Sequence, residues 1–234
     1  MEINIAVAKR DKYLSQGSGD TLEIIERPTG GISLVMADGK MQNRDSKQIS
    51  NKVAHHVINL IGEGKLDGAA VRSAAGMLFH EFSGQAQASL SVLSCDCDSE
   101  TLIITQVSRT PVVIFHDNEV RLSTAEHSLI GMEAHLEPTI AEFEIEPGTS
   151  IIMFTEGIML AGHNQEFLPD LRTNIQALFE EQAPTSQEIA DFLLIQAVGL
   201  DKGEPENDMC VAVLQILPDS AESTRYMTVK LPLT

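Results

Sequence analysis

The dominant pattern along the chain is an alternation of hydrophobic and polar residues with a period of two, which predicts β-strands. Near the N-terminus it predicts a strand over residues 3–10 and a hairpin of two strands, 20–28 and 31–38, that turns at Thr29-Gly30. Further strands are predicted at 87–96, 101–108, 111–117, 119–123, 141–147, 149–157, 208–217 and 225–233. Short polar turns separate several of them, as in an antiparallel meander.

Four other segments carry apolar residues at spacings of three and four, the period of an amphipathic helix. These helices are predicted at about 45–63, 67–82, 169–182 and 186–198. The last one follows Pro184, and the hydroxyl of Thr185 or Ser186 can cap the free amides of its first turn. The resulting order is strands, two helices, strands, two helices, strands.

This order lacks the regular alternation of strand and helix that builds a doubly wound parallel sheet. Two stacked antiparallel sheets, each covered on its outer face by a helix pair, would bury every apolar stripe. We therefore predict an α+β fold of four layers, an α-β-β-α sandwich. The chain shows no internal repeat and no linker rich in Pro, Gly or Ser, so residues 1–234 are predicted to form a single domain.

The formal net charge of −18 argues against nucleic acid and anionic membranes as partners, because both are bound through clustered Lys and Arg. No apolar run is long enough to span a membrane, and the N-terminus lacks the charge order of a signal peptide. We expect a cytoplasmic protein. An excess of carboxylates can also supply hard oxygen ligands to divalent cations.

The three cysteines are Cys95, Cys97 and Cys210, an odd number without the spacing of a disulfide framework. Cys95-Asp96-Cys97 could be half of a thiolate metal site. No second cysteine pair or nearby histidine completes four ligands, so we interpret these residues as buried or edge-strand thiols.

Acidic residues occur where predicted strands begin or end, next to a tight turn or loop. Asp20 opens a strand, Asp38 closes one before Gly39, Glu156 closes another before Gly157, and Asp208 precedes the strand 209–217. If these strands lie side by side, the four carboxylates converge and repel one another unless a cation lies between them. Mg²⁺ or Mn²⁺ would suit such oxygen ligands, and Gly39 would allow its carbonyl to approach the ion.

Taken singly, each of these acidic residues has a structural explanation, because Asp-Gly and Glu-Gly after a strand are common turn signals. Composition and spacing alone lead only to an α+β domain. The ordered set of motifs says more.

Four segments carry a family resemblance: "SGDTLEIIERPTGGISLVMADG", "SKQISNKV", "IIMFTEGIMLAG" and "GEPENDMCVAVLQI". Together, and in this order, they resemble the type 2C (PPM) metal-dependent protein phosphatases, in particular the bacterial branch related to SpoIIE and RsbU. The resemblance extends from about Gly17 to Leu217. It implies the same α-β-β-α sandwich and hydrolysis of phosphoserine or phosphothreonine by a water that bridges two Mn²⁺ or Mg²⁺ ions.

The resemblance also implies roles for individual residues. Asp20 would bind one metal, Asp38 would bridge both, and Gly39 would offer its carbonyl. Glu156 and Asp208 would complete the other site, and Asp20, Asp38 and Asp208 would act catalytically through the metal-bound water.

The sequence departs from the family pattern in three places: "DGKMQNR" has no second glycine, Glu156 stands where the family has Asp, and Asn207-Asp208 replaces a pair of aspartates. A second hypothesis follows from these departures, a weakened or inactive phosphatase-like module that binds a protein partner.

The substrate expected from the resemblance is a phosphorylated regulatory protein of the anti-sigma-factor-antagonist kind. The helix pair at 45–82 could serve as a switch or as the surface of a homodimer. Lys9, Arg10, Lys12 and Arg44 are candidate phosphate clamps, although an isolated basic residue is more often a solvated charge.

Overall fold

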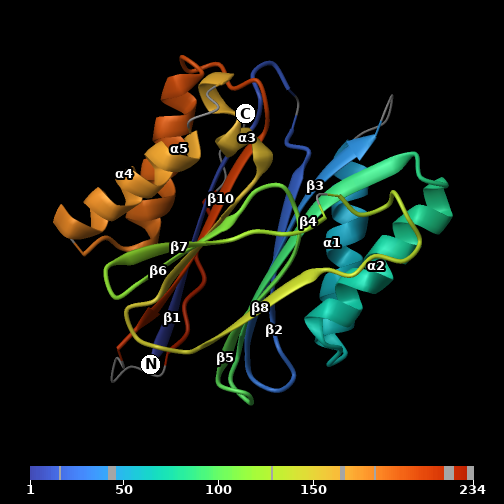
Figure 1. The fold of residues 1–234 in the computed structure, drawn as a ribbon, viewed down its shortest axis with the longest axis horizontal. Helices are drawn as coiled ribbons and strands as arrows, with labels where there is room; N and C mark the ends of the chain where they lie inside the picture. Colours follow the sequence, from blue (N-terminus) through green and yellow to red (C-terminus); the bar gives the residue numbers. More distant parts are fainter. Residues whose placement is uncertain are drawn as a thin grey trace.

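The computed structural model describes residues 1–15, 17–41, 46–127, 129–163, 167–181, 183–218 and 224–230. In this part of the chain two five-stranded sheets lie face to face, and a pair of helices covers the outer face of each (Figure 1). The predicted four-layer α+β sandwich is therefore confirmed. The assignment of residues 1–234 to a single domain stays a prediction.

The first sheet has the strand order β1-β10-β9-β6-β7, and all of its neighbouring strands are antiparallel. Its strands are β1 (Glu2–Arg10), β10 (Met209–Leu217), β9 (Ser150–Phe154), β6 (Val112–His116) and β7 (Glu119–Ser123). The first and last strands of the chain are neighbours, with Arg10 opposite Met209. The loop that follows β1 therefore starts beside the segment that leads into β10.

The second sheet has the order β2-β3-β4-β5-β8, again entirely antiparallel. Its strands are β2 (Asp20–Glu26), β3 (Gly31–Met41), β4 (Ala86–Asp96), β5 (Thr101–Val107) and β8 (Thr139–Glu144). The predicted hairpin at 20–38 forms β2 and β3, and the predicted meander supplies β4 to β7.

The helices lie outside the sheets (Figure 1). Helices α1 (Ser46–Gly62) and α2 (Asp67–Phe82) cover the second sheet, while α4 (Phe167–Glu181) and α5 (Ser186–Leu200) cover the first. Thr185 caps α5 as predicted: its hydroxyl accepts from the Glu188 amide and its own amide donates to the Glu188 carboxylate. Two short helices, α3 (Glu156–Met159) and η1 (Ala161–His163), follow β9. In the described residues no helix is long and apolar enough to cross a membrane.

Strand β3 shows how the layers are built, because its apolar residues alternate between two cores. Leu34 and Met36 pack between the two sheets, whereas Val35 and Ala37 pack against α1 and α2. All four are buried. A strand covered on both faces reads as a continuous apolar run, which is why "SLVMA" lacks the alternation of a surface strand.

Three sequence predictions were wrong in detail. Residues 225–230 form no strand, while 231–233 lie outside the described residues. Strand β9 ends at Phe154, so that Glu156 begins a helix instead of closing a strand. Strand β3 runs on to Met41, and Asp38-Gly39 therefore lies inside the strand and makes no turn.

Candidate active site

Asp20 and Asp38 lie directly opposite each other in the antiparallel pair formed by β2 and β3. Side chains at such positions point to the same face of the sheet and lie within a few ångströms of each other, about 5 Å between Cβ atoms. Because Asp38 is two residues after Met36, it faces the space between the two sheets, as Met36 does. Asp20 is only 2% exposed.

Gly39 points the other way, toward α1. A Cβ atom at this position would lie 2.3 Å from the Ser46 carbonyl oxygen and 2.7 Å from the Ser50 amide nitrogen. The glycine is thus required by the close packing of α1 on β3, not by a turn as the sequence suggested. Asp38 thus presents its carboxylate on one face of β3, and Gly39 on the other face leaves room for α1 to pack closely.

Thr155 connects Asp20 to the first sheet. Its hydroxyl donates to Asp20 Oδ2 at 2.8 Å and accepts from the Cys210 amide at 3.0 Å. Thr155 is 3% exposed and precedes α3, so Glu156 starts that helix beside the Asp20 carboxylate. Sequence reasoning missed Thr155, although it stands in the "TEG" motif that singled out Glu156.

Asp208 organises the loop between β1 and β2. Its two carboxylate oxygens accept hydrogen bonds from the Lys12 amide at 2.9 Å and from the Gly19 amide at 2.7 Å. The backbone of Asp208 also lies close to α3, because a Cβ on Gly157 would be 2.0 Å from the Asp208 carbonyl oxygen. Asp208 is therefore held next to the start of β2 and to the start of α3.

The structure thus brings together Asp20, Asp38, Glu156 and Asp208, which we call the acidic cluster. Burial raises the pKa of the Asp20 carboxyl to about 7, and the Asp38 and Asp208 carboxylates contribute to that rise. Burial also raises the pKa of Asp38 to about 6, with Lys40 opposing the rise and Glu156 and Asp208 adding to it. The raised pKa values of Asp20 and Asp38 are those expected for carboxyls that are partly desolvated and close to other carboxylates.

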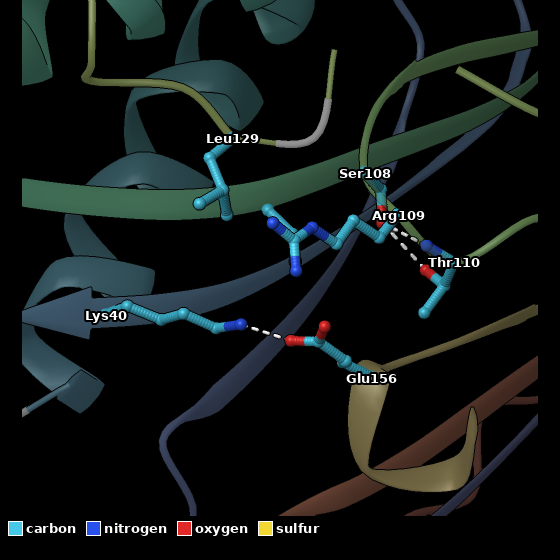
Figure 2. Close-up of a pocket in the computed structure, with 7 residues that line it drawn as sticks. Lys40, Ser108, Arg109, Thr110, Leu129 and Glu156 are labelled. Carbon is cyan, nitrogen blue, oxygen red and sulfur yellow. Dashed lines mark hydrogen bonds and ion pairs between the residues drawn. The ribbon is translucent and has the colours of Figure 1, made fainter. Parts of the chain in front are cut away.

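Lys40 supplies a positive charge within this cluster. Located two residues after Asp38 on the same face of β3, it forms an ion pair with the Glu156 carboxylate (Figure 2). The Glu156 side chain is 16% exposed and that of Lys40 42%. In this structure the predicted metal ligand Glu156 is therefore neutralised by a lysine from the chain itself.

Two further lysines bind the backbone of Asp20. The ammonium groups of Lys9 and Lys47 both donate to the Asp20 carbonyl oxygen, at 2.9 and 2.6 Å. Burial lowers the pKa of Lys47, and the nearby charge of Lys9 lowers it further. Lys9 thus fixes the start of β2 instead of standing as an isolated solvated charge. Arg44, another candidate phosphate clamp, lies outside the described residues.

Among the described residues, no group of three or more His, Cys, Asp or Glu side chains stands in a ready-made metal-binding arrangement. Thr155, Lys40 and two backbone amides engage the carboxylates of the acidic cluster. The donor set nonetheless suits a hard cation: it consists of carboxylate oxygens whose mutual repulsion such an ion would relieve.

A pocket lies next to Glu156 on the side of the turn between β5 and β6 (Figure 2). The residues that line it are Lys40, Ser89, Ser108, Arg109, Thr110, Leu129 and Glu156. Of these, sequence reasoning had identified only Glu156 as a site residue. Arg109 gave no signal, because it stands alone in a turn between two apolar strands.

Cys95 and Cys210 are buried and Cys97 is exposed, and all are free thiols. Burial raises the pKa of Cys95 and of Cys210 to about 12. The interpretation of these residues as structural thiols agrees with this arrangement, since neutral buried thiols make poor metal ligands.

With this geometry established, comparison with known proteins identifies the family. The family model described as stage II sporulation protein E (SpoIIE) matches residues 28–217, which include Asp38, Gly39, Glu156 and Asp208. The chain belongs to the SpoIIE family. A curated member, the stage II sporulation protein E of Bacillus subtilis (strain 168), is 21% identical over 207 residues. That match covers 85% of this chain but 24% of the relative, so the chain spans about a quarter of that protein's length.

Solved structures of PP2C phosphatases share the fold of this chain. The PP2C phosphatase domain of SpoIIE from Bacillus subtilis, with a fragment of its regulatory domain, superposes with a TM-score of 0.79 at 20% identity and covers 92% of this chain and 64% of that one. The catalytic domain of the serine/threonine phosphatase PstP, in complex with two manganese ions, gives a TM-score of 0.70 at 14% identity, covering 92% and 99%. The resemblance drawn from the four motifs is confirmed.

Proposed function

We propose that this protein is a metal-dependent phosphatase that hydrolyses phosphoserine or phosphothreonine on a regulatory protein. The observation that carries the proposal is the acidic cluster, in which four non-adjacent segments bring carboxylates together and neighbouring carboxylates add to the raised pKa of Asp20 and of Asp38. Clustered carboxylates with perturbed pKa values occur frequently at functional sites. Membership of the SpoIIE family and the PP2C-type fold support the same activity.

Two Mn²⁺ or Mg²⁺ ions fit this donor set. Asp20 would hold one ion, and Glu156 with Asp208 would hold the other. Asp38 would serve both ions, and Gly39 would offer its carbonyl. When bound, such ions supply positive charge for a phosphoryl group and make water a better nucleophile at neutral pH. The two manganese ions in the PstP complex support the choice of metal and the number of ions.

The residues around the cluster have positioning roles in this proposal. Thr155 orients the Asp20 carboxylate through its hydroxyl, and the Lys12 and Gly19 amides orient that of Asp208. Lys9 and Lys47 fix the Asp20 backbone through its carbonyl oxygen. These contacts hold the charged side chains in place, which preserves their spacing when a substrate binds.

The substrate class and the setting are part of the proposal. A phosphorylated anti-sigma-factor antagonist is the kind of substrate expected, in a cytoplasmic signalling role and with the α1–α2 pair as a homodimer surface. The net charge of −18 opposes binding to nucleic acid or to anionic membranes.

The test is hydrolysis of 4-nitrophenyl phosphate and of a phosphoserine peptide by the full chain, with and without Mn²⁺. Asp38→Asn and Asp208→Asn should each lower kcat at least a hundredfold, because each removes a charge that holds the cation. Asp98→Asn, at an exposed turn between β4 and β5, is the matched control and should leave the rate unchanged. Calorimetric titration with Mn²⁺ should show binding that Asp38→Asn weakens.

Hydrolysis that ignores Mn²⁺, or that survives both substitutions, would refute the metal-dependent reaction. The alternative of a protein-binding module without activity predicts no Mn²⁺ binding at all. The retained carboxylates at all four predicted positions oppose that alternative.

A further inference from the structure

The pocket of Figure 2 lies between the turn that joins β5 to β6 and the Lys40–Glu156 ion pair. Because Glu156 belongs to the acidic cluster, this pocket adjoins the candidate active site. Its lining contains two cationic side chains and three hydroxyl residues, Ser89, Ser108 and Thr110. We call it the Arg109 pocket.

Arg109 is exposed, and none of the ion pairs within the described part of the chain includes it. Other arginines do have acidic partners: Arg27 with Asp67, Arg72 with Glu137, Arg121 with Glu119 and Arg225 with Glu26. Figure 2 shows the Arg109 side chain extending across the pocket toward the space between Leu129 and Lys40. In a protein with net charge −18, an arginine left unpaired beside carboxylates is available to an anion from solution.

The backbone that carries Arg109 is fixed by buried hydrogen bonds. The hydroxyls of Ser108 and Thr110 are 2.7 Å apart, and the Thr110 amide donates to Ser108 Oγ at 3.1 Å. The side-chain amide of Gln106 donates to the Thr110 carbonyl at 3.2 Å. These three supporting residues are at most 5% exposed. The turn therefore presents Arg109 from a rigid base, so little ordering of the backbone is needed when it binds.

Electrostatics indicates what the pocket would bind. A phosphate monoester is a dianion, and the acidic cluster repels it at short range. A guanidinium group presents a planar fork of donors that matches two phosphoryl oxygens, and it stays charged at every physiological pH. Lys40 adds positive charge on the opposite wall of the pocket but is engaged by Glu156.

We propose that Arg109 binds the phosphoryl oxygens of the phosphorylated substrate and, after hydrolysis, those of inorganic phosphate. This inference rests on the proposed function, since it names the residue that recognises the substrate of the same site. Arg109 is thus a substrate-binding residue delivered by the β5–β6 turn, at the rim of the acidic cluster.

The direct test is binding of inorganic phosphate to the full chain in Mg²⁺ buffer, measured by ³¹P NMR line broadening. Arg109→Ala should weaken the affinity about ten- to a hundredfold, the range for loss of a hydrogen bond between two charged groups. Arg109→Lys should fall between wild type and Arg109→Ala, because an ammonium keeps the charge but loses the fork. Arg121→Ala is the matched control, an exposed arginine outside the pocket, and should bind phosphate as wild type does.

A kinetic test distinguishes phosphate binding by Arg109 from the proposed phosphatase activity. With 4-nitrophenyl phosphate, Arg109→Ala should raise KM about tenfold or more while Arg121→Ala leaves it unchanged. Phosphate binding that depends on Arg109 in a protein without hydrolytic activity would support the pocket and refute the phosphatase. An active Arg109→Ala variant with unchanged KM and phosphate affinity would refute phosphate binding by Arg109 and leave the phosphatase proposal intact. Absence of phosphate binding to the wild-type chain, or an equal loss in Arg121→Ala, would also refute the pocket.

Discussion

The ammonium group of Lys40 forms an ion pair with the carboxylate of Glu156 and so connects the end of β3 in one sheet to the start of α3 beside the other. Glu156 is one of the residues proposed to hold a divalent cation. A cation at that carboxylate would have to displace Lys40 and would be repelled by its charge.

Replacement of Lys40 by methionine should therefore strengthen Mn²⁺ binding. The expected gain is roughly two- to fivefold, because an ion pair that is partly exposed contributes about 1 kcal/mol or less. Calorimetric titration of the metal-free protein measures it. Lys52→Met is the matched control, since Lys52 is similarly exposed and pairs with Glu81 on the helices, away from the cluster. Weaker Mn²⁺ binding by Lys40→Met would mean that Lys40 supports the metal site.

The metal-free protein should lose stability as the pH rises from about 4 to 7. The raised pKa values of Asp20 and Asp38, about 7 and 6 against an ordinary 3.8, mean that folding favours the protonated carboxyls. Ionising these carboxyls in the folded protein therefore costs free energy. This cost is absent below the unfolded-state pKa, grows between the unfolded-state and folded-state pKa values, and is complete above the folded-state pKa. Its size is on the order of a few kcal/mol. Thermal unfolding in EDTA at pH 5 and pH 8 measures it.

Asp20→Asn tests the origin of that cost. In EDTA at pH 8 it should raise the Tm by several degrees, since a stabilisation of 1 kcal/mol is worth roughly 2–4 °C in a chain of this size. The gain should vanish at pH 4, where the wild-type carboxyl is protonated. Asp98→Asn, at an exposed turn, should leave both Tm values unchanged. A lower Tm for Asp20→Asn at pH 8 would contradict the prediction.

Thr155→Val should destabilise the protein by about 1–3 kcal/mol, because the Cys210 amide loses its hydroxyl acceptor in a buried position. It should also raise the pKa of Asp20 further, since the Thr155 hydroxyl donates to that carboxylate. Thr155→Ser keeps the hydroxyl and should retain most of the wild-type stability. Denaturant unfolding at pH 8 compares the variants, and a loss in Thr155→Ser as large as that in Thr155→Val would contradict the role given to the hydroxyl.

Gly39→Ala should destabilise the contact between α1 and β3. The added Cβ would lie 2.3 Å from the Ser46 carbonyl, and backbone atoms cannot yield as a flexible side chain can. We expect a loss of roughly 2 kcal/mol or more, as is usual for overpacking against a rigid neighbour. Gly199→Ala in α5 has open space around it and should stabilise the helix by about 1 kcal/mol at most. Equal stability of Gly39→Ala and wild type would contradict the close packing.

Thiol titration with an aromatic disulfide reagent should distinguish the cysteines. At pH 8 the exposed Cys97 should react within minutes. Cys95 and Cys210 should react only in denaturant, because burial both covers their sulfurs and raises their pKa to about 12. Cys97→Ser should abolish the fast phase, and a fast phase that persists would show that a buried thiol is accessible.

The fold could be predicted largely from periodicity, because each element carries its own local signal. The run 67–82 gave α2 with correct bounds, and the hairpin at 20–38 followed from two apolar runs around Thr29-Gly30. The predicted strand did not form over residues 225–230, because an alternating pattern does not by itself provide a neighbouring strand to pair with. Glu156 was misplaced in a strand since a four-residue helix is too short to show a helical period.

Sequence by itself determined which residues bear the acidic charge and that Asp20, Asp38, Glu156 and Asp208 stand at or near the ends of strands, because these are properties of local order along the chain. Only the tertiary structure decided which groups face those carboxylates. The Lys40–Glu156 ion pair, the Thr155 bond to Asp20 and the approach of Arg109 each join segments far apart in sequence. Such contacts depend on how two sheets stack and on the register of their strands, and neither leaves a periodic signal in the chain.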